Sequence, residues 1–178
     1  SADSKRLAVA GGDRVVRIYE VSGDAKLSLV GRFVCSTSGL VDSLAWNPDA
    51  KALACSTVVD GKRVMQVCDS ATGSLLKTVA GVGLLGGWTR DGRFFLAAND
   101  RHEAVVWKFP EWTVERTFPD MTGFIRGLAW SPDEQSVAVA GDDKQCRVWA
   151  VDGSQIAEFK LQSPLITTPG RLSWRRDG

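Results

Sequence analysis

Histidine is almost missing from this sequence, because His102 is the only one among 178 residues. A Ser–His–Asp or Cys–His catalytic set would therefore have to use His102 as its base. This residue stands among the charged residues Asp100, Arg101 and Glu103, as is typical of a solvated loop, and no G-x-S-x-G nucleophile motif occurs. The acidic residues are scattered, mostly in predicted turns. We therefore predict that the chain is not an enzyme and has no catalytic residues.

Closely spaced cysteines are also missing. The four cysteines are separated by 20, 13 and 78 residues, with no C-x-x-C pair: Cys35, Cys55, Cys68 and Cys146. Structural zinc sites use pairs of nearby ligands so that short loops can wrap the ion, so no metal site is expected. The last three cysteines lie in apolar alternating segments and are interpreted as small buried hydrophobic residues. The stretch Gly81–Gly87 lacks the Lys-Ser/Thr of a phosphate-binding loop and begins a predicted strand, so no cofactor is expected.

Neither an excess of one charge nor a long apolar run is present. The net charge is +1, with 44% hydrophobic and 24% charged residues, which is ordinary for a globular protein. No apolar run approaches the roughly 18 residues of a membrane-spanning helix, and the opening SADSKRLAVAGGDR lacks the layout of a signal peptide. We therefore expect a cytoplasmic or nuclear protein without a membrane partner. A nucleic-acid partner is not expected either, since Arg171, Arg175 and Arg176 form only one small basic cluster.

One phrase repeats along the chain, as LAWNPDAKALA from Leu44 and as LAWSPDEQSVAVA from Leu128. The repeat extends to four tryptophans, each followed three residues later by aspartate, at steps of 42, 42 and 44 residues: Trp46, Trp88, Trp130 and Trp174. A second column, at steps of 49, 39 and 42 residues, contains Tyr19, Cys68, Trp107 and Trp149. A period of about 40–45 residues built from short strands is the signature of propeller blades.

Apolar segments of four to eight residues predict strands throughout, separated by turn sequences such as Asn47-Pro48-Asp49 and Asp60-Gly61. No stretch has a helical apolar period of useful length. The predicted fold class is therefore all-β, with sixteen strands at residues 7–10, 15–20, 27–34, 40–46, 52–56, 64–69, 74–79, 83–88, 94–98, 104–108, 113–118, 124–130, 136–140, 145–151, 155–161 and 170–174.

These columns, together with the segment GDDKQCRVW that ends at Trp149, make the chain resemble the WD-repeat β-propeller family. The resemblance covers essentially the whole sequence and implies four-stranded antiparallel blades, whose strands a to d run from the innermost to the outermost. It implies one propeller domain, or part of one, over 1–178, with blade-forming units at about 1–34 with 170–178, 35–79, 80–118 and 119–161. The family's Asp–His–Ser–Trp tetrad is incomplete in every blade: Asp13 and Asp143 take the aspartate position without a histidine. Rigidity is therefore expected to depend more on packing than on that polar network.

The predicted strands amount to about four blades, beginning at a strand b and ending at a strand a. The last strand, at 170–174, needs a partner because a lone strand leaves its backbone groups unpaired. It could complete the blade begun by residues 7–34. Three arrangements satisfy the ends: the chain is part of a longer propeller, two copies close a ring of eight blades by exchanging ends, or one copy closes on itself as four blades.

The resemblance also implies a function. The loops between strands b and c and between d and a share one face of the family's disc, where ligand peptides dock, and their mixed charges suit a protein partner. The leading hypothesis is a non-catalytic protein–protein interaction scaffold, and the alternative is a structural assembly module whose strand ends complete a larger ring with another copy or chain. The expected partner-binding residues are Arg14, Asp60, Lys62, Arg63, Asp100, Arg101, His102, Asp142 and Lys144, and loops 36–39, 119–122 and 162–169 share this face. The expected blade core is Trp46, Trp88, Trp107, Trp130, Trp149 and Trp174, whereas Trp112 follows Phe109-Pro110-Glu111 in a turn and is expected to be partly exposed.

Overall fold

The computed structural model describes residues 1–24, 26–34, 40–119, 121–161 and 172–175. Fifteen strands and no helix occur within these ranges, so the predicted all-β fold class is confirmed. Over the same ranges, no helix is long and apolar enough to cross a membrane.

The strands form four antiparallel sheets, in which strands that are consecutive in sequence are hydrogen-bonded neighbours. The first sheet has three strands and the other three sheets have four each. Their bounds are β1 (Arg6–Ala10), β2 (Val15–Val21) and β3 (Leu27–Val34); β4 (Ser43–Trp46), β5 (Ala52–Val59), β6 (Lys62–Asp69) and β7 (Leu75–Ala80); β8 (Val82–Trp88), β9 (Phe94–Asn99), β10 (Ala104–Lys108) and β11 (Thr113–Phe118); and β12 (Ile125–Trp130), β13 (Ser136–Gly141), β14 (Gln145–Ala150) and β15 (Gln155–Lys160).

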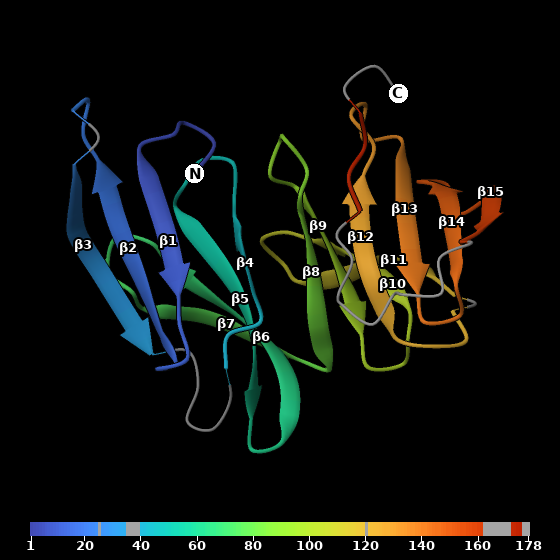
Figure 1. The fold of residues 1–178 in the computed structure, drawn as a ribbon, viewed down its shortest axis with the longest axis horizontal. Coiled ribbons are helices and arrows are strands. Elements are labelled where there is room, and N and C mark those ends of the chain that lie inside the picture. Colours follow the sequence, from blue (N-terminus) through green and yellow to red (C-terminus); the bar gives the residue numbers. More distant parts are fainter. Residues whose placement is uncertain (25, 35–39, 120, 162–171, 176–178) are drawn as a thin grey trace.

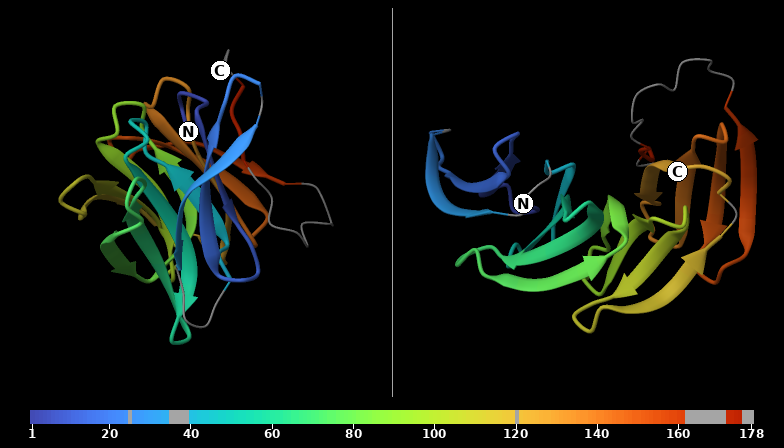
Figure 2. Two further views of the ribbon diagram at one scale, coloured as in Figure 1. Left: turned by 90° about the vertical axis from the view of Figure 1, so that its left-hand side faces the viewer. Right: turned by 90° about the horizontal axis from the view of Figure 1, so that it is seen from below.

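The four sheets follow one another along an open arc (Figure 1), and the view from below in Figure 2 shows the first and last sheets at the two ends of this arc. β8 contacts both β4 and β12, so the second, third and fourth sheets meet along their first strands. This is the arrangement of propeller blades, with the first strand of each blade innermost. β1 takes the place of a strand b, as predicted.

Burial follows the apolar pattern of the strands. The second strand of each four-stranded sheet is largely buried, because it lies between two strands and between neighbouring sheets. The outermost strands β7, β11 and β15 are mostly exposed. Three hydrophobic clusters fill the seams between consecutive sheets, around Leu53 in the first seam, Phe95 in the second and Val139 in the third.

The tryptophans of the predicted blade core connect consecutive sheets. Trp149 is buried, and the half-buried ones are Trp46, Trp88, Trp107, Trp130 and Trp174. The Trp130 indole N–H donates to the carbonyl of Gly87 at 3.2 Å, and the Trp174 indole N–H donates to the carbonyl of Ala129 at 3.3 Å. Gly87 and Ala129 each stand immediately before a tryptophan of the same column, so the two hydrogen bonds are equivalent in the repeat.

The predicted sixteenth strand is wrong for the part of it that the structure describes. Leu172–Arg175 form no strand, and residues 170 and 171 lie outside the described ranges. The physical reason is that a strand needs a backbone ladder with a neighbour, and none of the four sheets includes Leu172–Arg175. The assignment of 170–178 to the same blade as 1–34 stays a prediction.

Candidate functional site

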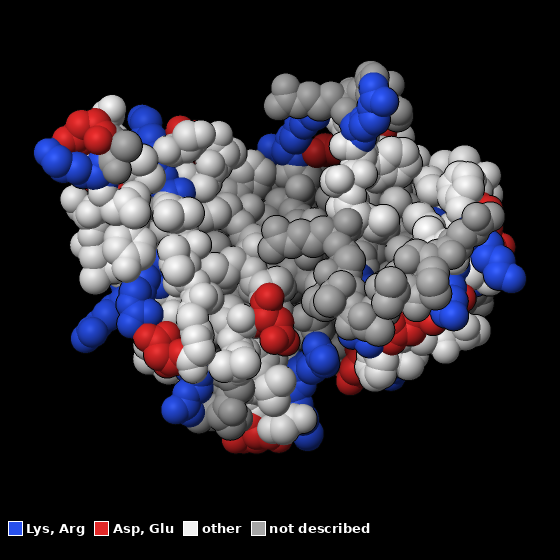
Figure 3. Space-filling model, in the orientation of Figure 1, with Lys and Arg blue, Asp and Glu red and all other residues white. Residues whose placement is uncertain are grey.

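The loops between the second and third strands of the blades, together with the starts of the first strands, enclose a pocket of about 350 Å³. We call it the loop-face pocket. Its charged lining residues are Asp42, Arg63, Asp100 and Arg126, and its apolar lining includes Leu84 and Phe124. Figure 3 shows positive and negative side chains intermixed at the lower end of the molecule, where the β5–β6 turn lies in the view of Figure 1.

Gly81 and Gly83 position the wall of the pocket that carries Arg63 and Asp100. Gly81 (φ +74°) forms the one-residue connection from β7 to β8, and its N–H donates to the Arg63 carbonyl at 2.8 Å while its own carbonyl accepts from the Asp100 N–H at 2.8 Å. The Arg63 side chain lies directly on Gly83, where an added Cβ would stand 3.0 Å from the guanidinium. The Gly81–Gly87 stretch is therefore a tight turn and a strand that let two blades approach closely.

The charges of this wall are only loosely paired. The Arg63 guanidinium lies 3.7 Å from the Asp42 carboxylate, and the two side chains are 51% and 47% exposed. An ion pair of this length between half-exposed groups contributes little to stability. Arg63 can therefore exchange Asp42 for another carboxylate at low cost.

The opposite wall is fixed. Arg126 binds Asp142 in a bidentate pair with N–O distances of 2.7 and 2.6 Å. The hydrogen bond from Arg126 lowers the pKa of Asp142. The Arg126 guanidinium also lies over the Phe124 ring at 5.6 Å, and His102 packs edge-on against that ring at 4.6 Å.

A second pocket of about 400 Å³ continues from the first along the inner strands. The two share Asp42, Leu84 and Arg126, and the second adds apolar side chains from β4, β8 and β12 together with Leu172. The arrangement is a channel with both leucine and polar side chains in its lining, beneath a rim of mixed charge. It suits a polypeptide ligand that offers both apolar and ionic groups.

The structure brings some of the predicted residues together and leaves others apart. Arg63 and Asp100 line the pocket, whereas Asp142 and His102 contact lining residues. The other predicted residues are exposed on the same loops without lining the pocket: Arg14, Asp60, Lys62, Arg101 and Lys144. Loops 36–39 and 162–169 lie outside the described ranges, as does residue 120 of the 119–122 loop.

Sequence reasoning missed Asp42, Phe124 and Arg126. A signal was present for two of them, because Asp42 and Arg126 stand four residues before Trp46 and Trp130 in the same repeat column. That column begins the innermost strand, where side chains face the channel.

The cysteines fit their predicted structural role. Cys55 and Cys68 are buried in β5 and β6, Cys146 is half-buried in β14, and Cys35 lies outside the described ranges. Burial raises the pKa of the Cys68 thiol to about 12. Across the part of the chain that the structure describes, no group of His, Cys, Asp and Glu is arranged to hold a metal ion.

Comparisons with known proteins agree with the architecture. Residues 112–150 match the family model "WD domain, G-beta repeat". The chain is 30% identical over 164 residues to "Cell division cycle 20.6, cofactor of APC complex" of Arabidopsis thaliana, covering 86% of this chain and 37% of that protein. It is 25% identical over 158 residues to "Chromatin assembly factor 1 subunit FAS2 homolog" of Oryza sativa subsp. japonica, covering 83% of this chain and 31% of that protein.

A solved structure is similar in fold. One chain of "Crystal Structure of Mitotic Checkpoint Complex" superimposes with a TM-score of 0.75 at 20% identity, over 90% of this chain and 49% of that chain. The chain thus spans about a third of the length of these two curated relatives and half of the solved chain. The repeat columns, the sheets arranged as blades and the family match agree: the chain has the fold of a divergent WD-repeat β-propeller, and its segment 112–150 matches the WD repeat itself.

Proposed function

We propose that the protein is a non-catalytic protein-interaction scaffold that binds a partner polypeptide at the loop-face pocket. The observation that carries this proposal is the channel of mixed apolar and polar lining, beneath a rim on which Arg63 is half-exposed and loosely paired. The names of the relatives support it, since they describe a cofactor of the APC complex and a subunit of a chromatin assembly factor. A cytoplasmic or nuclear location stays a prediction.

The two arginines of the pocket would have different roles. Arg126 is held by Asp142 through two short hydrogen bonds and so shapes the wall, while Arg63 has only a 3.7 Å ion pair to exchange. A partner carboxylate at Arg63 would form a charge-assisted hydrogen bond, which is roughly twice as strong as a neutral one. Arg63 is therefore the expected anchor of the interaction.

The test compares two charge reversals one residue apart, Arg63→Glu and Lys62→Glu. Lys62 is the exposed first residue of β6, next to Arg63, and does not line the pocket, so it is a matched control for the change in net charge. The 178-residue chain is used as bait, and captured proteins are quantified by mass spectrometry. We expect Arg63→Glu to deplete specific partners by at least about tenfold and Lys62→Glu to retain them, with unchanged melting temperatures. Equal loss with both variants, or unfolding of the Arg63→Glu variant, would contradict the proposal.

A specific observation also favours the assembly role. β1 pairs only with β2 among the described strands, and beyond Arg6, whose backbone N–H and carbonyl bond to Ser1, its other edge has no strand partner among them. Leu7 and Val9 of β1 are each 43% exposed, whereas the equivalent strands β5, β9 and β13 are largely buried. An open edge with exposed apolar side chains is a template for pairing with another strand. Light scattering decides whether that strand comes from a second copy, because self-association predicts twice the 19.2 kDa mass of one chain and a monomer excludes it.

A further inference from the structure

The seam between the second and third sheets is closed at the end opposite the loop-face pocket. Trp88, the repeat tryptophan of the third sheet, lies under two aromatic residues of the turn between β10 and β11. Its ring is 4.8 Å from Phe109 and 5.6 Å from Trp112, both edge-on. Trp112 also reaches Phe95 at 6.0 Å. This turn therefore covers its seam with its own aromatic rings.

The seam between the third and fourth sheets has the same plan but lacks that cover. Trp130 corresponds to Trp88 in the repeat, and the turn from β14 to β15 corresponds to the turn that carries Trp112. At the position with positive φ, the first turn has Trp112 (φ +57°) and the second has Gly153 (φ +98°). Val151 follows Trp149 by two residues, as Phe109 follows Trp107, so Val151 stands where the first turn has Phe109.

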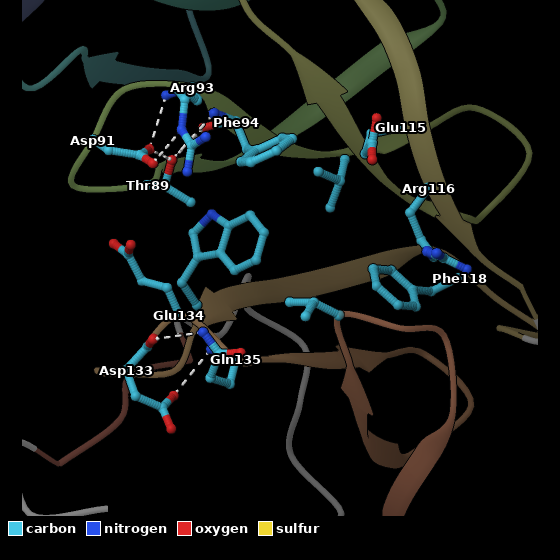
Figure 4. Close-up of a pocket in the computed structure, with 13 residues that line it drawn as sticks. Thr89, Asp91, Arg93, Phe94, Glu115, Arg116, Phe118, Asp133, Glu134 and Gln135 are labelled. Carbon is cyan, nitrogen blue, oxygen red and sulfur yellow. Dashed lines mark hydrogen bonds and ion pairs between the residues drawn. The ribbon is translucent and has the colours of Figure 1, made fainter.

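A pocket of about 310 Å³ lies at this seam, and we call it the seam pocket. This volume is at the lower end of the roughly 300–1,000 Å³ of ligand pockets. Its apolar lining comes from both sheets and includes Phe94, Phe118, Trp130 and Val151. Figure 4 shows Asp91 and Arg93 on one side of the pocket and Asp133 and Glu134 on the other.

Hydrogen bonds between the two sheets hold the walls in place. The Arg90 N–H donates to the Glu134 carboxylate at 2.6 Å, and the Trp130 indole donates to the Gly87 carbonyl at 3.2 Å. A pocket whose walls are already fixed loses little conformational freedom when a ligand enters, and this favours binding.

The charge around the seam pocket is negative. Four carboxylates line it, from Asp91, Glu115, Asp133 and Glu134, against two arginines, Arg93 and Arg116. Arg93 is already paired with Asp91 at 2.6 Å. The rim therefore favours a ligand with positive charge near its apolar group.

We propose that the seam pocket binds a partner polypeptide by taking up an aromatic side chain that has lysine or arginine beside it. The aromatic residue would contact Trp130 as Trp112 and Phe109 contact Trp88, and the basic neighbours would face Glu115 and Glu134. A tryptophan or phenylalanine is preferred because ring contacts of this geometry add to the burial of the side chain. This surface is independent of the loop-face pocket.

The test uses the 15N-labelled 178-residue chain and the peptide acetyl-Gly-Lys-Trp-Lys-Gly-amide, followed by two-dimensional NMR. We expect shifts at the amides of Phe94 and Gln135 and at the Trp130 indole N–H. The peptide with alanine in place of tryptophan should bind at least about tenfold more weakly. The peptide with glutamates in place of both lysines should also bind more weakly, by a margin that shrinks in high salt.

Two protein variants control for surface stickiness. Val151→Trp should fill the pocket from its own turn and abolish the shifts, whereas Val30→Trp adds a tryptophan at another exposed valine, on the first sheet, and should bind as the parent does. Binding should persist in Arg63→Glu, which separates this proposal from the loop-face pocket. Equal binding of the alanine peptide, survival of the shifts in Val151→Trp, or shifts confined to the region of Arg63 and Asp100 would each overturn the proposal.

Discussion

Replacing Asp143 with alanine is expected to destabilise the protein far more than the same replacement at Asp13. The two aspartates occupy the same place in the repeat, and each pairs with an arginine four residues later. Asp143 lies 2.6 Å from Arg147, with the two side chains 5% and 9% exposed. Asp13 lies 2.5 Å from Arg17, with the two side chains 48% and 35% exposed. The chain thus contains the same ion pair in a buried and an exposed form.

The size of the stability loss depends on which partners Arg147 keeps after Asp143 is replaced. Removing one partner of a buried pair leaves an uncompensated charge and costs about 3–5 kcal/mol. Arg147 keeps a second carboxylate, Glu158 at 3.1 Å, which is 41% exposed. We therefore place the loss for Asp143→Ala at the lower end of this range, about 3 kcal/mol. For Asp13→Ala we expect no measurable change, because water replaces the lost partner.

Guanidinium chloride unfolding followed by tryptophan fluorescence measures the difference. With a slope of about 4 kcal/mol per molar denaturant, the midpoint of Asp143→Ala should fall by about 0.75 M. The double variant Asp143→Ala with Arg147→Met should recover much of this loss, because it leaves no buried unpaired charge; Glu158, which also loses Arg147, is 41% exposed to water. Equal midpoints for Asp143→Ala and Asp13→Ala, or a double variant less stable than Asp143→Ala, would refute the reasoning.

Three further predictions concern single sites. Hydrogen bonds from the Arg93 backbone and the Thr89 hydroxyl lower the pKa of Asp91 from 3.8 to about 2. The parent chain should thus be more stable than Asp91→Asn above pH 3.8, and this difference should disappear as the pH falls through about 2. Unfolding midpoints of both proteins across this pH range measure the difference. Since its thiol pKa is about 12, Cys68 should resist iodoacetamide at pH 8 until the chain unfolds, and peptide mapping would report early labelling as a contradiction. Gly86→Ala would place its Cβ 2.8 Å from Leu96 and should cost about 1–3 kcal/mol, whereas Gly23→Ala, which meets nothing within 4 Å, should leave the melting temperature unchanged.

The strand framework could be predicted because turn residues and apolar alternation agree along the chain. The predicted strands at 27–34, 104–108 and 113–118 match β3, β10 and β11. The prediction for β5 ended at residue 56, but the strand continues to Val59 and pairs with β6 up to the two-residue turn Asp60-Gly61. Both turn residues have positive φ, as such tight hairpin turns require. The polar residues Ser56 and Thr57 made β5 look shorter than it is, whereas the turn sequence Asp60-Gly61 indicated its true end.

The candidate site was only partly predictable. Arg63 and Asp100 were found because they lie on the loops that the family resemblance indicates. The Arg126–Asp142 pair joins β12 to the turn that follows β13, at positions 16 residues apart. A sequence pattern does not specify which charged residues meet in this way. The proposed role of Arg63 depends on its loose pairing with Asp42. That pairing is defined by a distance and by the exposure of both side chains, which the sequence alone does not give.

The seams of this propeller are stabilised in different ways, and this explains where its pockets lie. In the first and fourth sheets, the aspartate position of the family's tetrad is filled and paired with an arginine in place of the missing histidine. The second and third sheets have Lys62 and Arg101 at that position, and the seam between them is instead closed by the aromatic group around Trp88. The fourth sheet is held by its buried ion pair and has glycine in its turn, so the neighbouring seam keeps an open pocket. The repeats thus differ where the packing of a seam no longer depends on a given position, and the proposed seam pocket lies at such a position.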